Sequence, residues 1–191
     1  VKAALDPHEL ANPEKLFPKP GAPAAGREYP RREAAPLSPA ESSLVDLVRS
    51  SPSAVRLRIK GAGTRWSEPT PSGVVELSTA GLDRIVDLDK NNQTLSVECG
   101  IRLNNLHDAL NREGLFLRLP KDGGTLGGLL AARPWSGIRE DLLGLRILLP
   151  NGEIVELGGK VVKNVAGYDL SRLALGSWGG FGVFLEAIFK V

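Results

Sequence analysis

Three glycine-rich stretches are the parts of this sequence whose composition points to ligand chemistry. They read KGAGTRW (60–66), DGGTLGG (122–128) and GSWGGFG (176–182). Glycine allows positive φ and close approach of a ligand, and successive amide N–H groups in such loops form a concave donor site for phosphate oxygens. A single stretch is read more simply as a tight turn, whereas three in one small domain favour a long phosphorylated ligand. No Walker A sequence is present, and Trp66 stands where a Rossmann fingerprint needs glycine.

Few side chains are candidates for acid–base catalysis. His8 lies near the start of the chain, and His107 lies in a predicted helix, where an exposed or capping histidine is the simpler interpretation. Lys163 and Arg172 could meet a carboxylate ligand, but a solvated lysine and a helix-surface arginine explain them equally well. Cys99 follows the period of a strand and is interpreted as a small buried apolar residue. The catalytic residues therefore stay unknown at this level.

Composition excludes several classes of function. The chain has 191 residues and a net charge of +2, with acidic and basic residues mixed, which does not favour a nucleic-acid or membrane-surface protein. The single cysteine rules out an internal disulfide and a cysteine-based zinc cluster, and no metal site is predicted. No apolar run is long enough to span a bilayer, and no signal peptide is evident, so a cytoplasmic location is expected.

Proline marks a boundary near residue 37. Eight of the fourteen prolines lie in the first 40 residues, and residues 1–37 are predicted to form an extended arm or linker ahead of one domain over 38–191. The sequence begins with Val1 and has no methionine, which fits either a GTG start translated literally or an excised fragment.

Periodicity within 38–191 predicts short helices and strands in an α+β fold. Ser38, Pro39 and Glu41 form the start of a helix with a capping box. The elements predicted after it are strands within 54–61 and 73–79, a hairpin of 84–89 and 94–100, a helix over 103–113 capped by Gly114, a hairpin over 143–157 turned at Asn151-Gly152, a helix over 169–175 and a last strand over 182–191. This order lacks the regular β-α alternation of a doubly wound fold.

Four segments resemble one known family. The stretch VVKNVAGYDLSRLALGSWGGFGV resembles the signature of FAD-linked oxidases of the vanillyl-alcohol oxidase (PCMH-type) superfamily. The block RPWSGIREDLLGLRILLPNGEIVELGG resembles in particular the E-type FAD-binding subunit of bacterial glycolate oxidase. IKGAGTRW is similar to the first pyrophosphate loop of the superfamily, and GGTLGGLLA to its second flavin-contacting loop. The resemblance extends over about residues 41–191 and implies a PCMH-type domain of two α+β subdomains.

The resemblance also implies a set of FAD-binding residues. The first loop would hold the diphosphate, the second would line the FAD along its length, and two residues of the third would contact the adenosine half through the backbone. These residues are Gly61, Ala62, Gly63, Thr64 and Arg65, then Gly123, Gly124, Thr125, Gly127 and Gly128, then Gly182 and Val183. Family members with covalent flavin have histidine where this chain has Thr64, so the FAD is expected to be non-covalent. Trp66, Trp135 and Trp178 are equally compatible with the core, with a partner interface and with stacking on flavin.

The implied activity is oxidation of glycolate, or another 2-hydroxy acid, within a complex. Its partners would be a D-type catalytic flavin subunit and an iron–sulfur subunit, which could hold the chain at a membrane. Residues 4–18 also resemble the C-terminal signature of the D-type subunits, which suggests a fusion remnant or a packing arm, the alternative being a disordered tail with accidental similarity. The family's substrate domain would begin where this sequence ends, so the chain is expected to be catalytically incomplete alone.

Two departures from the family pattern keep other interpretations open. Gly180 and Phe181 replace the threonine and leucine of the usual glycine signature, and the stretch between GGLLA and RPWSG is short. A structural or assembly subunit with a degenerate flavin site therefore remains an alternative, as does the FAD domain of a truncated standalone oxidase.

Overall fold

The computed structural model describes residues 36–52, 55–64, 68–120, 123–132, 136–159 and 170–191. Within these ranges the elements, in chain order, are α2 (Pro39–Ser50), β1 (Arg56–Lys60), β2 (Val74–Ser78), β3 (Ile85–Asp89), β4 (Thr94–Glu98), α3 (Leu103–Arg112), α4 (Leu126–Ala132), α5 (Ser136–Asp141), β5 (Leu142–Leu148), β6 (Ile154–Gly158), α6 (Leu170–Ala174) and β7 (Val183–Lys190). The predicted arm over 1–37 falls almost wholly outside these ranges and stays a prediction.

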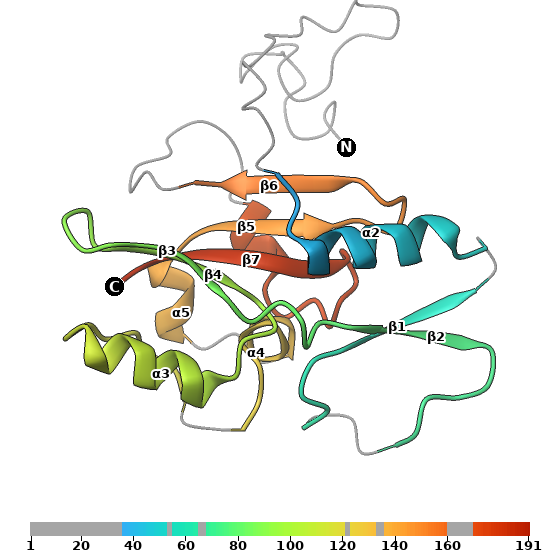
Figure 1. Cartoon of the computed structure of the whole chain (residues 1–191), viewed down its shortest axis with the longest axis horizontal. Coiled ribbons are helices and arrows are strands. Elements are labelled where there is room, and N and C mark those ends of the chain that lie inside the picture. Colours follow the sequence, from blue (N-terminus) through green and yellow to red (C-terminus); the bar gives the residue numbers. More distant parts are fainter. Residues whose placement is uncertain (1–35, 53–54, 65–67, 121–122, 133–135, 160–169) are drawn as a thin grey trace, which may run out of the picture. The chain divides into compact units, whose positions relative to one another are not determined.

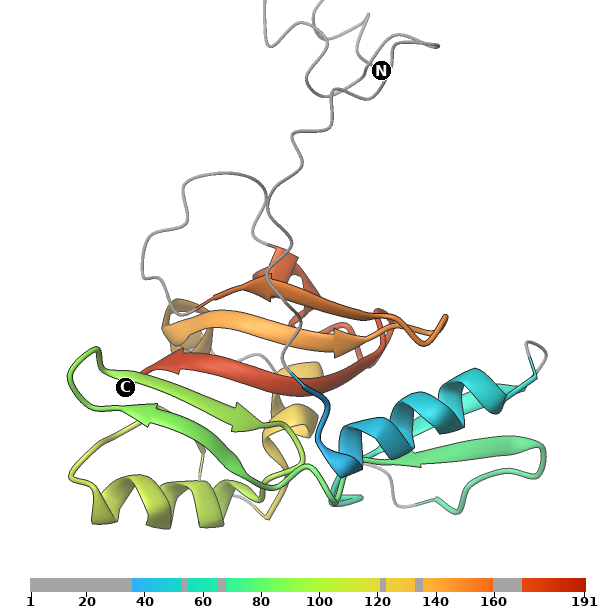
Figure 2. The same ribbon diagram turned by 45° about the horizontal axis from the view of Figure 1, so that its top comes forward.

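The strands form two separate sheets, which confirms the α+β class. Five strands make an antiparallel sheet in the order β3-β4-β7-β5-β6, and β1 pairs with β2 in parallel. Helices α3, α4 and α5 lie on one side of the five-stranded sheet, while α2 runs alongside the β1–β2 pair (Figures 1 and 2). None of the helices in the described part of the chain has the length and apolarity of a membrane-spanning segment.

Strand β7 lies at the centre of the larger sheet and supplies both hydrophobic clusters. Phe184 and Phe189 join the cluster between the sheet and α3 and α4, whereas Val183 and Leu185 join the one beneath α2. A register shift against β5 lets positions of opposite parity, Phe184 and Phe189, reach the same cluster. The strand is therefore buried on both faces, and the residues just before it are held close to the core.

The predicted start of α2 is confirmed, and it has a long-range partner. Ser38 accepts a hydrogen bond from the Glu41 N–H, and the Glu41 carboxylate accepts one from the Ser38 N–H. The same carboxylate receives Arg146 Nη1 of β5 at 2.9 Å, with both side chains more than nine-tenths buried. Glu41 therefore caps the helix and also ties it to the larger sheet.

The predicted turns are confirmed, with one difference in detail. Gly114, just after α3, has φ of +69° and Gly152, in the β5–β6 turn, has φ of +80°. Asn151 is not in the left-handed region. Its side-chain oxygen instead accepts a hydrogen bond from the Glu153 N–H, so the turn is stabilised by an Asx-type contact.

The structure contains two helices and one strand pairing that the sequence does not predict. Helix α4 begins at Leu126, inside the stretch 122–128 that is interpreted from the sequence as a loop, and α5 follows it. Helix α4 forms despite two glycines because Leu126, Leu129 and Leu130 are buried in the main core. The parallel pairing of β1 with β2 places the end of β1 opposite α4, and this arrangement makes the site described next.

Candidate functional site

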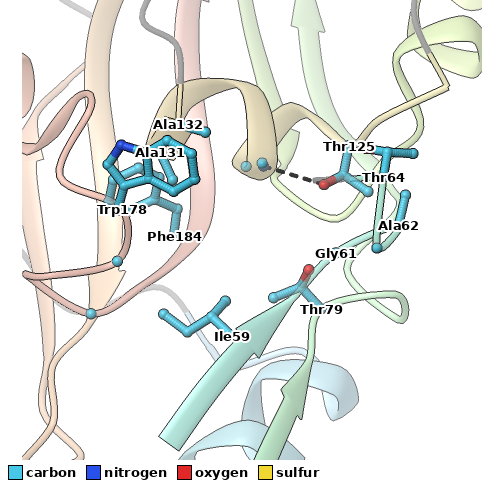
Figure 3. Close-up of a pocket in the computed structure, with 15 residues that line it drawn as sticks. Ile59, Gly61, Ala62, Thr64, Thr79, Thr125, Ala131, Ala132, Trp178 and Phe184 are labelled. Atoms are coloured by element: carbon cyan, nitrogen blue, oxygen red, sulfur yellow. Dashed lines mark hydrogen bonds between the residues drawn. The ribbon is translucent and has the colours of Figure 1, made fainter. Parts of the chain in front are cut away.

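A pocket lies between the end of β1, the start of α4 and the turn before β7 (Figure 3). All three glycine-rich stretches contribute to its lining. The lining residues are Ile59, Gly61, Ala62, Gly63, Thr64, Thr79, Thr125, Gly127, Gly128, Ala131, Ala132, Trp178, Gly179, Gly182 and Phe184. Segments that are more than 100 residues apart in the sequence therefore converge on one cavity.

The loop 61–64 offers backbone donors to this pocket. Within the described part of the chain, the N–H groups of these four residues make no hydrogen bond to protein. Gly63 has φ of +73°, and a Cβ placed on it would meet only Lys60 Cε, at 3.5 Å. The loop is thus a short run of unpaired amides beside open space, the kind of backbone that binds phosphate oxygens.

The first turn of α4 differs from that loop because its amides are already paired. The Leu126 N–H donates to the Ile101 carbonyl at 3.0 Å, and the Gly127 N–H donates to the Cys99 carbonyl at 2.6 Å. The Gly128 N–H donates to Thr125 Oγ1 at 3.2 Å, as at a helix N-cap. This segment therefore shapes one wall of the pocket while its leading N–H groups serve the protein itself.

Three of the predicted glycines are required by chain packing. A Cβ on Gly61 would lie 2.2 Å from Thr125 Oγ1, and one on Gly127 would lie 2.9 Å from the Cys99 carbonyl oxygen. A Cβ on Gly182, whose φ is +134°, would lie 2.1 Å from the Leu148 carbonyl oxygen. The sequence suggested tight turns or a ligand as reasons for these glycines; contact with the Thr125 side chain at Gly61, and with backbone carbonyls at Gly127 and Gly182, is a third reason, and each of the three residues also lines the pocket.

Trp178 forms part of the pocket in an unusual backbone conformation. Its φ is +54°, in the left-handed region that bulky residues rarely adopt. The Trp178 N–H donates to the Ala131 carbonyl at 3.0 Å, which anchors the turn to the end of α4. The indole lies beside Ala131 and Phe184 (Figure 3), and 61% of the surface of Trp178 is exposed to solvent.

No titratable side chain is among the 15 described residues that line the pocket. Lys60 is a charged residue close to the lining, since its Cε lies 3.5 Å from a Cβ placed on Gly63, and its Nζ pairs with Glu76 Oε1 at 3.0 Å. Hydrogen bonds from Thr70 and Lys60 hold the pKa of Glu76 below its usual value. The described lining can therefore bind and orient a ligand through amides, threonine hydroxyls and apolar surface, without supplying an acid or base.

The structure brings together most of the predicted site residues. Those lining the pocket are Gly61, Ala62, Gly63, Thr64, Thr125, Gly127, Gly128 and Gly182. Gly123 and Gly124 precede this wall, where their carbonyls accept hydrogen bonds from Arg102 Nη1 and the Leu103 N–H. Val183 points into the core beneath α2, and Arg65 lies outside the described residues.

Two other predictions concern residues away from the pocket. His107 is buried rather than exposed, and its Nε2 lies 3.1 Å from the Leu119 carbonyl oxygen, so the ring ties α3 to the following loop. Cys99 is buried, as predicted, and burial raises the pKa of its thiol. In the described part of the chain, no group of three His, Cys, Asp or Glu side chains is placed to hold a metal ion.

Several lining residues were not singled out from the sequence as site residues. Ile59 and Thr79 follow from the parallel pairing of β1 with β2, and Ala131 and Ala132 follow from the existence of α4. Alternation along the last strand gives no usable signal for Phe184, because it places this residue on the face opposite Phe189, whereas the two share one cluster.

Comparison with known proteins gives one family model and several relatives. The model for the FAD binding domain matches residues 40–158. The chain is 41% identical over 118 residues to glycolate oxidase subunit GlcE of Escherichia coli, covering 56% of this chain and 34% of that protein. It is 34% identical over 146 residues to glycolate oxidase subunit GlcD of Bacillus subtilis, covering 69% and 31%.

A third relative covers almost the whole chain. An uncharacterized FAD-linked oxidoreductase of Mycobacterium tuberculosis is 30% identical over 197 residues, which cover 97% of this chain and 41% of that protein. Among solved structures, alkyldihydroxyacetonephosphate synthase matches with a TM-score of 0.63 and 23% identity, covering 79% of this chain and 29% of that one; this likeness shows the fold. The chain therefore spans between 31% and 41% of the length of these three curated relatives.

Proposed function

The chain belongs to the FAD-binding domain family of PCMH-type flavoproteins, and from this premise we propose that it binds FAD non-covalently in the pocket between loop 61–64 and α4. In this proposal it is the FAD-binding subunit of a complex that oxidises glycolate or a related 2-hydroxy acid. The cofactor is FAD, as the family model and the FAD-linked relatives indicate.

The observation that carries the proposal is the row of unpaired amides at 61–64. Four consecutive N–H groups without a protein partner in the described chain border a pocket, and Gly63 leaves space in front of them. A diphosphate is the part of FAD that needs such donors. Thr64 occupies the position at which covalently flavinylated family members carry histidine, which supports a non-covalent cofactor.

The rest of the pocket suits the remaining parts of a dinucleotide. Ala131, Ala132 and Gly128 give a wall of small residues, and Trp178 and Phe184 give aromatic surface at one end. Long, flat ligands bind in such apolar clefts with only a few fixed polar contacts. The residues present therefore fit FAD, with the backbone as the main polar partner.

The absence of titratable groups from the described lining supports a role as one part of a complex. Oxidation of a 2-hydroxy acid removes two electrons and two protons, and a base must accept the hydroxyl proton. When bound, FAD supplies the two-electron acceptor. The described pocket offers amides, hydroxyls and packing for the cofactor, and we assign the base and the carboxylate-binding cation to a D-type catalytic flavin subunit, with an iron–sulfur subunit as onward acceptor.

The substrate class is suggested by the relatives' names. Besides the glycolate oxidase subunits, they include a D-lactate dehydrogenase of Anaerostipes hadrus and a D-2-hydroxyglutarate dehydrogenase of Xanthomonas citri, 33% and 32% identical to this chain. The three named substrates are all 2-hydroxy acids. Glycolate is our first choice because the GlcE relative has the highest of these identities.

A non-enzymatic function is the second candidate. Gly180 and Phe181 stand in place of the family's threonine and leucine, and Phe181 is 45% exposed without lining the pocket. A structural or assembly subunit that retains the fold without retaining flavin would show this pattern. The two candidates differ in a single property, which is whether the purified protein holds FAD.

The first experiment mixes the purified chain with FAD, removes free cofactor by gel filtration and records the visible spectrum. Retained flavin bands that pass to the supernatant on acid precipitation support non-covalent FAD. A protein that elutes colourless favours the structural subunit, and colour that stays with the precipitate contradicts the non-covalent assignment.

The second experiment adds glycolate, D-lactate or D-2-hydroxyglutarate to the FAD-loaded chain, alone and after co-expression with D-type and iron–sulfur subunits. We expect bleaching of the flavin band only in the complex, and fastest with glycolate. Bleaching of the isolated chain would show that it is catalytically complete.

A further inference from the structure

Lys60, the last residue of β1, lies beside the open space in front of loop 61–64. Its Cε is 3.5 Å from the position that a Cβ on Gly63 would occupy, and it is the one atom of the described chain, outside Gly63 and its chain neighbours, within 4 Å of that position. The ammonium nitrogen of Lys60 lies farther away and pairs with Glu76 instead. The aliphatic stem of this lysine therefore borders the space at Gly63, while its charge is held by another anion.

The ion pair of Lys60 with Glu76 is one that the lysine can leave. Lys60 Nζ lies 3.0 Å from Glu76 Oε1 and 3.2 Å from Glu76 Oε2. The two side chains are 42% and 32% exposed, and ion pairs with this much solvent access contribute little net stability. The Glu76 carboxylate also accepts a hydrogen bond from the Thr70 hydroxyl at 2.6 Å. The carboxylate therefore keeps a hydrogen-bond donor when the lysine turns away.

Arg58 stabilises the same carboxylate without help from Lys60. It stands opposite Glu76 in the register of β1 and β2, and its positive charge is among the influences that lower the Glu76 pKa. Its Nη1 donates to the Pro69 carbonyl at 3.0 Å and to Thr70 Oγ1 at 3.4 Å. The segment that carries Thr70 is therefore anchored to β1 through Arg58, and it does not depend on the lysine for its position.

We propose that Lys60 binds the phosphate groups held by loop 61–64, and that it exchanges Glu76 for them when the ligand enters. This inference rests on the proposed diphosphate site. Rotation about the Cδ–Cε bond moves the ammonium nitrogen and leaves Cε beside Gly63, so the exchange needs no change in the backbone. Lysine is suited to this role because its ammonium is a point charge on a flexible stem. A diphosphate carries more negative charge than one carboxylate, so it attracts the lysine more strongly than Glu76 does.

The test measures binding of FAD and of inorganic pyrophosphate, which carries the phosphates without either ring system. Calorimetric titration compares wild type with Lys60→Met, Glu76→Gln and the control Arg56→Met, which removes an exposed charge from the other end of β1. We expect Lys60→Met to bind both ligands about tenfold or more weakly, because a charge-assisted contact is lost. Glu76→Gln should bind both about threefold or more tightly, because the competing anion is gone. Arg56→Met should stay within about twofold of wild type, because solvent and salt screen its charge.

The pKa of Glu76 gives a readout that a purely structural lysine would not move. Hydrogen bonds from Thr70 and Lys60, with the charges of Lys60 and Arg58, lower this pKa in the free protein. Departure of the lysine removes part of that effect, so the Glu76 pKa measured by NMR should rise when pyrophosphate binds to wild type. In Lys60→Met it should already be higher in the free protein and should change less on binding. Urea denaturation checks that each variant folds, and the midpoints should be similar because the pair is exposed.

The outcomes also distinguish this inference from the proposed function. If Lys60→Met binds FAD and pyrophosphate as tightly as Arg56→Met does, the cofactor site stands and the role of the lysine is wrong. If Lys60→Met loses affinity for FAD and not for pyrophosphate, the lysine contacts another part of the cofactor and the phosphate assignment is overturned. If pyrophosphate leaves the Glu76 pKa of wild type unchanged, the lysine stays on Glu76 and the exchange is overturned. If wild type binds neither FAD nor pyrophosphate, both proposals fail.

Discussion

Replacing Gly63 with aspartate tests the diphosphate assignment most directly. A Cβ at this position meets only Lys60 Cε, at 3.5 Å, so the carboxylate would occupy the open space in front of the 61–64 amides. A phosphate held by those amides would lie about 4 Å away. Two unit charges at that distance repel by about 4 kcal/mol at an effective dielectric constant of about 20.

The expected loss of FAD-binding free energy is somewhat smaller than this repulsion of about 4 kcal/mol. The loop is partly exposed, and Lys60 is close enough to offset part of the added charge. We therefore expect Gly63→Asp to weaken FAD binding by about 2–4 kcal/mol, which is about 30-fold to 1,000-fold in the dissociation constant.

The matched control is Gly63→Asn. Asparagine has nearly the shape of aspartate, tolerates the φ of +73° equally well and carries no charge. The assay is titration of apoprotein with FAD, followed by flavin fluorescence, with urea denaturation to check that both variants fold. We expect Gly63→Asn to bind within about tenfold of wild type. If Gly63→Asp binds FAD as tightly as Gly63→Asn, the diphosphate does not lie on this loop.

Three further predictions concern charges and a thiol outside the pocket. Glu41→Gln removes the buried carboxylate that pairs with Arg146 at 2.9 Å and leaves the longer ion pair of Arg146 with Glu156, at 3.7 Å. It should lower the free energy of unfolding by about 3 kcal/mol in urea denaturation, and a loss below about 1 kcal/mol would mean that the Glu41–Arg146 pair contributes little. Because Cys99 is buried and its thiol pKa is raised, a thiol reagent in mildly alkaline buffer should label it only as fast as the protein unfolds, and labelling at the rate of a free thiol would contradict this. The carboxyl pKa of Glu76 is lowered, so the contribution of this residue to stability is present at neutral pH and is lost as pH falls through the folded-state pKa. Thr70→Val should raise the Glu76 pKa in an NMR titration, and no change would mean that the Thr70 hydroxyl is not its main hydrogen-bond donor.

Features set by neighbouring residues were predictable from the sequence. The capping box of α2 depends on Ser38 and Glu41, three positions apart, and the ends of α3 and β5 depend on single glycines. Such signals involve hydrogen bonds within one turn, so a short window of sequence contains both partners. The positions of most helices and strands followed from these signals and from side-chain periodicity.

Features set by distant partners were not predictable in this way. Glu41 pairs with Arg146, 105 positions away, and nothing in either local sequence indicates the other. The α4 segment contains Gly127 and Gly128, which favour a loop on propensity alone, and tertiary burial of its leucines overrides that preference. The sequence favours an exposed or capping His107, because its carbonyl partner, Leu119, belongs to a loop whose path the sequence does not reveal.

Glycine is ambiguous in a sequence because the absence of a Cβ can serve two purposes, and the surroundings of each position resolve the ambiguity. At Gly61, Gly127 and Gly182 the missing Cβ makes room for other parts of the chain, whereas at Gly63 it leaves space open. Alanine at the first three positions should therefore lower the free energy of unfolding by about 1–3 kcal/mol through overpacking, to which the φ of +134° adds backbone strain at Gly182. Alanine at Gly63 should cost only about 1 kcal/mol, from its left-handed backbone. Measuring urea stability and FAD affinity for the four variants would separate the two purposes. If Gly63→Ala were the least stable of the four, the space in front of Gly63 would not be open in the folded protein.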